Sequence, residues 1–163
     1  MFLVKRAQRG DADAFIELIE QNKQALYKVA KAYLKNEEDI ADAIQDTVLS
    51  AFEHLGDLQK PMYFKTWLTR ILINQCNDIL KERRRCSLIE EFPDVADSRN
   101  IQSDAEFYDM LECLPEQYRS TFLLYYGQGF GTKEIAQILN ISENTVKSRL
   151  RRGRANLRSQ FIV

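Results

Sequence analysis

The sequence predicts an all-α protein with two small helical domains joined by a flexible acidic linker, the C-terminal domain containing a helix-turn-helix. Apolar residues recur at spacings of three and four, and no stretch alternates as a half-buried strand would. Only three prolines and six glycines interrupt the 163 residues. The periodicity is lost between residues 87 and 102, so we expect domains at 1–86 and 103–163 with a linker at 87–102.

The first long helix is expected to begin after Asp11 or Asp13, since either carboxylate can cap a helix N-terminus. Apolar residues at helical spacing then define the side expected to face the core. This stripe consists of Phe15, Leu18, Ile19, Leu26, Val29 and Tyr33.

A second helix is predicted to begin near Glu37, where acidic residues suit the positive end of the helix dipole. Its predicted core stripe is Ile40, Ile44, Val48, Phe52 and Leu55. Its opposite face presents Asp42, Gln45, Asp46, Leu49 and Glu53. From Asn36 to Gln59 there are seven acids and no Lys or Arg. An acidic face with an exposed leucine indicates a docking surface for a basic partner, and a plain solvated face is the alternative.

The third long helix is predicted from Tyr63 to Arg85, after a loop from Asp57 to Met62. Its core stripe is Phe64, Leu68, Ile71, Leu72 and Ile79. The remaining surface carries Lys65, Thr66, Arg70, Asn74, Asn77, Asp78 and Lys81. Trp67 is either a core residue or, beside amides and cations, part of a site that stacks an unpaired base.

The predicted linker contains Pro93, four acids and one arginine. After it, Ser103 and Glu106 predict a capping box for a helix that runs through Cys113. Pro115 suits the first turn of the next helix, which is expected to end at Gly127 and Gly129.

The segment from Gly131 to Arg158 has the pattern of a helix-turn-helix. Its first helix is expected to bury Ile135, Ala136 and Leu139. Asn140 occupies the turn, where a left-handed backbone favours Asn or Gly, and Ser142 can cap the second helix. Val146 and Leu150, one turn apart, are expected to point into the core.

The outward face of this second helix is expected to meet DNA bases and phosphates. It presents Asn144, Lys147, Ser148, Arg151 and Arg152. Six cations and no acid follow Glu143, although the formal net charge of the chain is −1. This segregation of charge indicates separate surfaces for a basic and a polyanionic partner, the alternative being a solvated basic helix.

Other function classes have little support. Cys76, Cys86 and Cys113 are widely spaced and only His54 could join them, so we expect neither a metal site nor a cofactor. No nucleophile, carboxylate pair or phosphate-binding glycine loop points to catalysis. The N-terminus becomes charged too soon for a signal peptide and no apolar run could span a membrane, so we expect a soluble cytoplasmic protein.

Four stretches, taken in order and spacing, carry a family resemblance. They are Glu38 to Asp46 (EDIADAIQD), Trp67-Leu68 with Arg70, Ile71, Asn74 and Asp78, then Leu114-Pro115-Glu116, and Glu134-Ile135-Ala136 through Thr145 to Arg149. With these stretches the chain resembles a bacterial extracytoplasmic-function (ECF) RNA polymerase sigma factor. It differs from the common family pattern at Asn140, at Gly131 and in the loop DLQKPMY, which lacks an Arg-Gly feature.

The resemblance implies a partner for each surface. Core RNA polymerase, through the clamp helices of its largest subunit, would bind Asp42, Gln45, Asp46 and Leu49. Promoter DNA would be opened and held at the −10 element by Leu58, Lys60, Trp67, Arg70 and Asn74. The −35 element would be read by Asn144, Lys147, Ser148, Arg151 and Arg152. The linker would follow the polymerase interior, and the family commonly has a membrane-anchored anti-sigma factor that masks both domains.

Two other functions stay open at the level of sequence. A stand-alone helix-turn-helix regulator would bind duplex DNA without polymerase, but the acidic helix would then have no partner. A helical enzyme or adaptor would need a catalytic constellation, and none is apparent.

Overall fold

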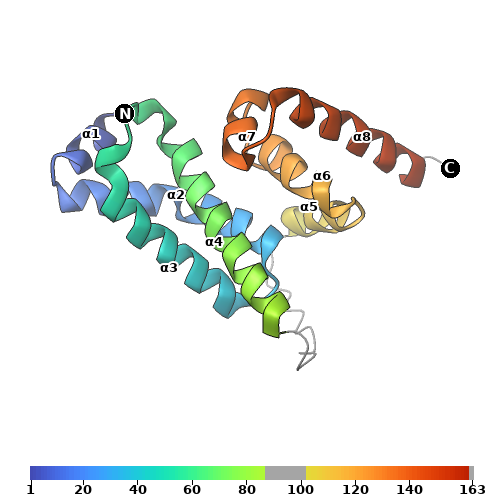
Figure 1. Cartoon of the computed structure of the whole chain (residues 1–163), viewed down its shortest axis with the longest axis horizontal. Coiled ribbons are helices and arrows are strands. Elements are labelled where there is room, and N and C mark those ends of the chain that lie inside the picture. Colours follow the sequence, from blue (N-terminus) through green and yellow to red (C-terminus); the bar gives the residue numbers. More distant parts are fainter. Residues whose placement is uncertain (87–101, 162–163) are drawn as a thin grey trace. The chain divides into compact units, whose positions relative to one another are not determined.

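The computed structural model describes residues 1–86 and 102–161, and these residues form helices, turns and short connections without a β-strand (Figure 1). The chain divides into two compact units, Met1–Pro93 and Asp94–Val163. The all-α prediction is therefore confirmed. The predicted linker lies outside the described residues, except for Gln102, which begins a helix.

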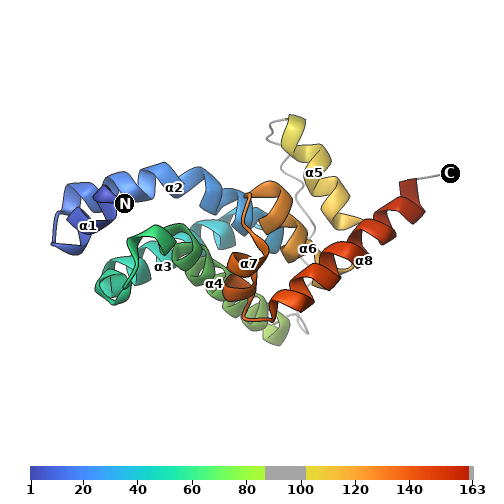
Figure 2. The same ribbon diagram turned by 90° about the horizontal axis from the view of Figure 1, so that it is seen from above.

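Unit 1 is a bundle of three long helices with a short helix packed on its first member (Figures 1 and 2). The short helix is α1 (Phe2–Gln8), which the sequence analysis did not predict. The long helices are α2 (Ala12–Tyr33), α3 (Glu37–His54) and α4 (Phe64–Cys86). Two 3-10 turns, η1 (Leu55–Asp57) and η2 (Pro61–Tyr63), lead from α3 into α4.

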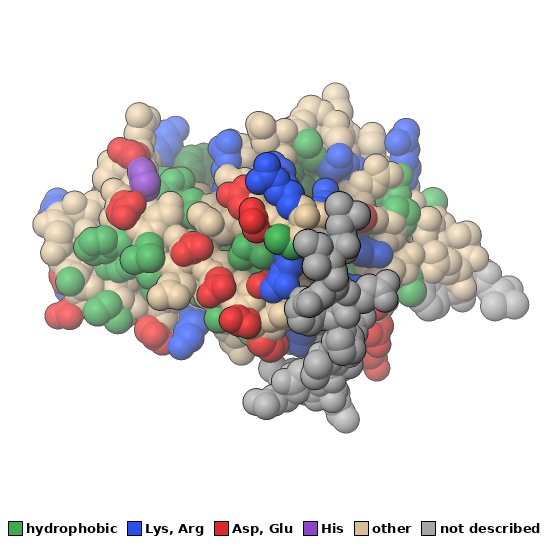
Figure 3. Space-filling model, turned by 60° about the horizontal axis from the view of Figure 1, so that its bottom comes forward, with side chains coloured by type: hydrophobic (Ala, Val, Ile, Leu, Met, Phe, Trp, Pro, Cys, Tyr) green, Lys and Arg blue, Asp and Glu red, His purple; other side chains and the backbone are tan. Residues whose placement is uncertain are grey.

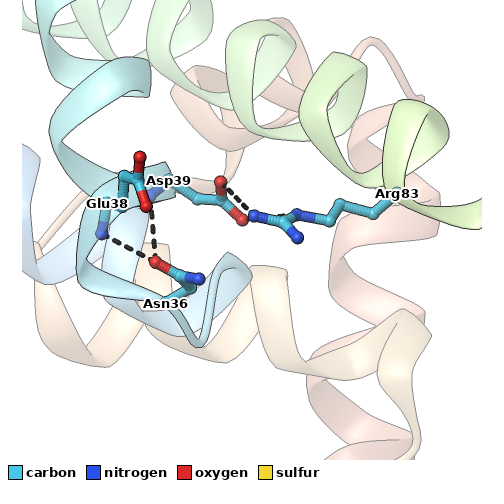
Figure 4. A network of polar contacts seen from close by, with 4 residues as sticks. All are labelled: Asn36, Glu38, Asp39 and Arg83. Atoms are coloured by element: carbon cyan, nitrogen blue, oxygen red, sulfur yellow. Dashed lines mark hydrogen bonds and ion pairs between the residues drawn. The ribbon is translucent and has the colours of Figure 1, made fainter. Parts of the chain in front are cut away.

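Side-chain caps fix the beginnings of α2 and α3. Asp11, rather than Asp13, caps α2 by accepting a hydrogen bond from the Ala14 backbone N–H at 3.2 Å. The Arg6 guanidinium donates to the same carboxylate, with its Nη2 at 2.6 Å, and this hydrogen bond is the main reason that the pKa of Asp11 lies below its ordinary value. Asn36 caps α3 by accepting from the backbone N–H groups of Glu38 and Asp39 (Figure 4). These caps set the register of both helices.

The core of unit 1 agrees with the prediction in α2 and differs from it in α3. In α2, Phe15, Leu18, Leu26 and Val29 are buried, while Ile19 and Tyr33 are half-buried. In α3 the buried residues are Ile40, Ala43, Thr47 and Ala51.

The predicted α3 stripe was right at its two ends, where Ile40 and Leu55 are buried, and wrong between them, where the buried residues each lie one position earlier. Ile44 and Val48 are only half-buried, and Phe52 is 63% exposed. Small side chains let neighbouring helices approach closely, and the Thr47 hydroxyl donates to the Ala43 carbonyl (2.7 Å). The prediction ranked residues by hydrophobicity alone, so it placed Ile44, Val48 and Phe52 in the core instead of the smaller residues that precede them.

In α4, Phe64, Leu68 and Leu72 are buried as predicted, while Ile71 and Ile79 are half-buried. Ile73 and Cys76 complete the core side. Thr66, which was predicted to lie on the surface, is buried. Burial raises the pKa of the Cys76 thiol to about 12.

The described part of unit 2, residues 102–161, contains four helices and one π-helical turn. They are α5 (Gln102–Glu112), α6 (Glu116–Phe122), the π turn η3 (Leu123–Gly127), α7 (Thr132–Leu139) and α8 (Glu143–Phe161). Since α5 already begins at Gln102, Ser103 lies inside its first turn and not at the predicted cap. Pro115 directly precedes α6 and acts as its N-cap residue, one position earlier than predicted.

The core of unit 2 forms where α6, α7 and α8 meet. Phe122, Leu124, Ile135, Val146 and Leu150 are all almost fully buried. In α7 the buried partner of Ile135 is Ile138, whereas Ala136 and Leu139, which were predicted to be buried, are half-buried. This difference arises because α7 presents an i, i+3 pair to α8.

A glycine allows α6 and α8 to pack closely together. Gly153 is buried in α8, and a Cβ atom at this position would overlap the aromatic ring of Phe122. The two helices can therefore cross at this separation only because residue 153 has no side chain.

Candidate functional site

The outward face of α3 forms a continuous exposed stripe, defined by Asp42, Gln45, Asp46 and Leu49. Their spacing of i, i+3, i+4 and i+7 places them along one side of the helix, and all four are exposed. Leu49 is 55% exposed. Within the described residues, neither Asp42 nor Asp46 takes part in an ion pair. The structure thus brings together the four residues predicted as a docking surface.

Phe52 extends this α3 stripe and was missed because it was placed in the core. Its ring contacts the edge of Phe15, with the ring centroids 5.3 Å apart, while most of the side chain remains exposed. Hydrophobic and acidic side chains lie close together on this part of the surface (Figure 3). Such a face suits a partner that offers both apolar and basic side chains.

The beginning of α3 is tied to the end of α4 by a bidentate ion pair. Arg83 donates from Nε and Nη2 to the two carboxylate oxygens of Asp39, at 2.8 and 2.7 Å (Figure 4). The Asp39 side chain is only 15% exposed, and its hydrogen bond with Arg83 raises the pKa of the guanidinium. A two-point contact of this kind fixes orientation as well as distance.

The exposed face of α4 carries a second stripe, defined by Trp67, Arg70 and Asn74. These residues are spaced at i, i+3 and i+7, and Asn77 and Lys81 continue the same line. The Trp67 ring is half-buried and lies 6.0 Å from the Phe64 ring, so it is neither wholly core nor free. Arg70 and Asn74 are exposed, and no hydrogen bond within the described parts of the chain occupies their side chains.

The loop before α4 is held against α1. Gln8 Nε2 donates to the carbonyl oxygens of Leu55 and Leu58, at 3.1 and 2.8 Å. Leu58 is half-buried, whereas Lys60 is exposed with its ammonium group 5.9 Å from the centre of the Tyr63 ring. The structure therefore groups Trp67, Arg70 and Asn74 on one face and places Lys60 just before that helix. Leu58 is not part of this face, and its backbone carbonyl is held by Gln8 of α1.

The turn between α7 and α8 has the predicted backbone. Asn140 adopts the left-handed conformation, with φ 55° and ψ 49°. The Ser142 hydroxyl accepts from the Thr145 backbone N–H at 3.1 Å and so caps α8. The Thr132 hydroxyl donates to the Glu143 carboxylate at 2.9 Å, which joins the starts of the two helices and lowers the pKa of Glu143. The helix-turn-helix prediction is confirmed.

The outward face of α8 carries the residues predicted to contact DNA. Asn144, Lys147, Arg151 and Arg152 are exposed and Ser148 is half-buried, while Val146 and Leu150 are buried on the opposite side. Lys147 lies 3.5 Å from the Glu143 carboxylate. Exposed pairs of this type contribute little, so the ammonium group remains available to an anionic ligand.

A pocket lies between α6 and α8, at the edge of this face. It has a volume of about 340 Å³ and is lined by Gln117, Tyr118, Asn144, Thr145, Ser148, Arg149 and Arg152. Sequence reasoning missed Gln117, Tyr118, Thr145 and Arg149. The spacing of Thr145, Arg149 and Arg152 at i, i+4 and i+7 could have indicated a second functional side of α8.

The described residues contain no group of three or more His, Cys, Asp or Glu side chains placed to hold a metal ion. None of the helices in residues 1–86 and 102–161 is long and apolar enough to cross a membrane.

Comparison with known proteins connects both units to transcription. Residues 18–86 match the family model of Sigma-70 region 2, and residues 104–157 match that of Sigma-70 region 4. The chain is 31% identical over 151 residues to the ECF RNA polymerase sigma factor SigM of Mycobacterium tuberculosis, covering 91% of this chain and 77% of SigM. The protein belongs to the ECF RNA polymerase sigma factors. The ECF sigma factor SigW of Bacillus subtilis is 26% identical, in an alignment that covers 97% of this chain and 94% of SigW.

Solved structures show the same fold. CnrH, in complex with the cytosolic domain of CnrY, superposes with a TM-score of 0.74 at 28% identity, covering 98% of this sigma factor and 94% of CnrH. The sigma factor RpoE of Bartonella quintana, in complex with the anti-sigma factor NepR, gives a TM-score of 0.72 at 23% identity, covering 89% and 94% of the two chains.

The sigma factor binds core RNA polymerase and promoter DNA and directs transcription initiation. The α3 and α4 stripes both lie in the region 2 match, and the outward face of α8 lies in the region 4 match. A stand-alone helix-turn-helix regulator is not favoured, because region 2 would then be unexplained.

Proposed function

We propose that the sigma factor divides promoter initiation among three surfaces. Residues 1–86 form the domain that docks on polymerase and opens the −10 element, and residues 103–163 form the domain that reads the −35 element, with 87–102 as the linker. The observation that carries this proposal is the pair of exposed stripes on α3 and α4, which the Asp39–Arg83 contact holds in one unit.

The α3 stripe is the proposed polymerase contact. Asp42, Gln45, Asp46 and Leu49 combine carboxylates that lack an ion pair among the described residues with exposed apolar surface. A basic amphipathic surface, such as the clamp helices of the largest polymerase subunit, would complement both properties.

The α4 stripe is the proposed site for an extruded base of the −10 element. Trp67 offers a partly exposed ring for stacking, and Asn74 can both donate to and accept from a base edge. Arg70 and Lys60 supply positive charge for the phosphates, and Leu58 and the loop around it contact the opened strand. Unstacking costs a few kcal/mol per step, and capture of the base offsets this cost.

The outward face of α8 is the proposed reader of the −35 element. Asn144, Ser148 and the cations at 147, 151 and 152 lie on the side of the second helix-turn-helix helix that would enter a major groove. Each unit alone offers few phosphate contacts, so tethering both to one polymerase raises their effective concentration at the promoter.

Regulation by an anti-sigma factor is proposed on the basis of the structural relatives. RpoE was solved in complex with the anti-sigma factor NepR, and CnrH was solved in complex with the cytosolic domain of CnrY. We expect a membrane-anchored anti-sigma factor that covers both units, and a sigma factor that works in the cytoplasm without catalytic activity of its own.

Substitution of two residues in the α3 stripe tests the central proposal. The double variant Asp46→Arg, Leu49→Ala reverses one charge and removes the exposed apolar side chain, so it should no longer co-purify with core polymerase. Both side chains are exposed, so its far-UV circular dichroism should match the wild type. Glu112→Arg makes the same charge change in unit 2 and serves as the control. Wild-type recovery of core enzyme by the folded double variant would show that α3 is not the docking helix.

A further inference from the structure

The pocket between α6 and α8 has a uniform chemistry. All seven lining side chains can donate a hydrogen bond: two amides, three hydroxyls and two guanidinium groups. None of the lining side chains is a carboxylate. A cavity in which every lining side chain can donate, and which holds two positive charges and no negative one, matches an anion that is rich in acceptor oxygens, such as a phosphate group.

The arginines of this pocket are available for a ligand. Glu143, the only acid in α8, is engaged by the Thr132 hydroxyl and by Lys147. Within the described residues, no ion pair involves Arg149 or Arg152. Their charge is therefore not neutralised inside the unit.

The wall formed by α6 is fixed independently of any ligand. Arg119 donates from Nε to the carbonyl oxygens of Leu111 and Leu114, at 3.1 and 2.9 Å, which ties α6 to the end of α5. On the other side, the close contact of Phe122 with Gly153 sets the distance between α6 and α8. Tyr118 is thus held at the pocket by the packing of its own helix.

The pocket shares part of its lining with the outward face of α8: Asn144, Ser148 and Arg152 belong to both, whereas Lys147 and Arg151 lie outside the pocket. Thr145, Arg149 and Arg152 form one line at i, i+4 and i+7 and face α6. Asn144, Lys147 and Arg151 form another line, at i, i+3 and i+7, of which only Asn144 reaches the pocket. A helix lying in a major groove has the sugar–phosphate backbone along its flanks, so a pocket on the α6 side of α8 is suited to contact a phosphate.

We propose that this pocket binds one backbone phosphate of the promoter duplex beside the −35 element, with Tyr118 and Arg149 as its positioning residues. The contact carries no base information and fixes the register of α8 in the groove. The proposal rests on the proposed −35 role of α8 and adds to it a phosphate site built by α6.

Holoenzyme binding to promoter DNA with single neutral phosphates provides the test. A methylphosphonate is placed in turn at each phosphate that flanks the −35 element, and affinity is measured over a range of KCl concentrations. Wild-type holoenzyme should lose roughly tenfold in affinity at one position, the loss expected for one charge-assisted hydrogen bond. Arg149→Ala should lose a similar factor on unmodified DNA, reduce the salt slope by about 1, and show no further loss at that methylphosphonate.

Two further variants separate this contact from general effects of charge or folding. Tyr118→Phe keeps the ring and removes only the hydroxyl, so it should give a smaller loss that is confined to the same phosphate. Arg158→Ala removes one positive charge outside the pocket and should keep the full sensitivity to that methylphosphonate.

Additive losses for Arg149→Ala and the methylphosphonate at every position would overturn the proposal, and so would an Arg149→Ala effect that depends on the −35 sequence. Failure of the −35 assignment has a different signature, because wild-type holoenzyme would then bind equally well to promoters with intact and scrambled −35 elements.

Discussion

At the scale of single residues, the packing of unit 2 depends on the absence of a side chain at residue 153. The missing Cβ lets α8 lie against the Phe122 ring, which is itself almost completely buried. Since α8 carries both the outward face and one wall of the pocket, this contact positions every residue proposed to meet the −35 element.

Gly153→Ala is therefore expected to destabilise unit 2. In the interior of a helix, alanine is normally more stabilising than glycine by about 0.5–1 kcal/mol. Overpacking of a tight core costs about 1–3 kcal/mol and should prevail here. Thermal unfolding followed by far-UV circular dichroism should show a lowered midpoint. The matched control is Gly56→Ala, because a Cβ at Gly56 would have no atom within 4 Å, and a midpoint equal to this control would contradict the expectation.

The three thiols differ in accessibility. Cys76 is completely buried and its pKa is raised to about 12, whereas Cys86 and Cys113 are exposed. The thiolate is the reactive form, so Cys76 should resist a disulfide reagent at pH 8. Titration of the native protein should count two rapidly reacting thiols, and the third should react only after denaturation. Three fast thiols in the native protein would mean that α4 is not packed as described.

At the scale of helices, local signals predicted the ends of α2, α7 and α8, placed the starts of α5 and α6 a residue or two away, and were less successful with core faces. Caps and turns depend on a few adjacent residues, so the roles of Asp11, Asn140 and Ser142 could be predicted from sequence. The core face of α3 could not, because the closeness of its neighbours, not hydrophobicity, selected Ala43 and Ala51 for the interior. Helix α1 was missed because seven residues give too little periodicity.

The candidate sites also divide into those that one helix forms, which the sequence could predict, and one that two helices form together, which it could not. The α3 stripe, the α4 stripe and the outward face of α8 each lie within one helix, so spacing alone could predict them. The pocket joins α6 to α8, and only the crossing of the two helices brings Tyr118 to Arg149. The α8 residues alone therefore do not reveal that Gln117 and Tyr118 complete the site.

The cap of α2 should make the stability of unit 1 depend on pH. The pKa of Asp11 is lower in the folded protein than its ordinary value of 3.8. The ionised carboxylate therefore contributes fully to the stability of unit 1 above pH 3.8, and this stabilisation is lost as the pH falls through the folded-state pKa. Asp11→Ala should therefore have a lower unfolding midpoint than the wild type at pH 6. The difference should shrink when both are measured in increasingly acidic buffers below pH 3.8, and a difference that stays constant would exclude the carboxylate as its source.

At the scale of the whole molecule, docking and strand opening are proposed for different helices, so one variant should separate them. Asn74→Ala should leave polymerase binding and the −35 contact intact, because Asn74 belongs to α4 and is part of neither the α3 stripe nor the outward face of α8. Open-complex formation should be slower, since the extruded base loses its hydrogen-bonding partner. Permanganate footprinting of thymines near the start site measures this step.

A promoter with a pre-melted bubble supplies the internal control for this variant. It should recover part of the lost opening, because the base no longer has to be extruded from a duplex. Normal thymine reactivity in the Asn74→Ala holoenzyme on an intact promoter would indicate that this face of α4 has only a structural role.

The contact between Asp39 and Arg83 has a mechanical consequence. It joins the first turn of α3 to the last turns of α4, so a tilt of α3 on its proposed polymerase partner would also move α4. If the proposed roles hold, the helix that contacts the polymerase also sets the angle at which Trp67 and Asn74 meet the strand. Accuracy in choosing where the DNA opens would thus depend on a pair of side chains that touch neither the polymerase nor the base.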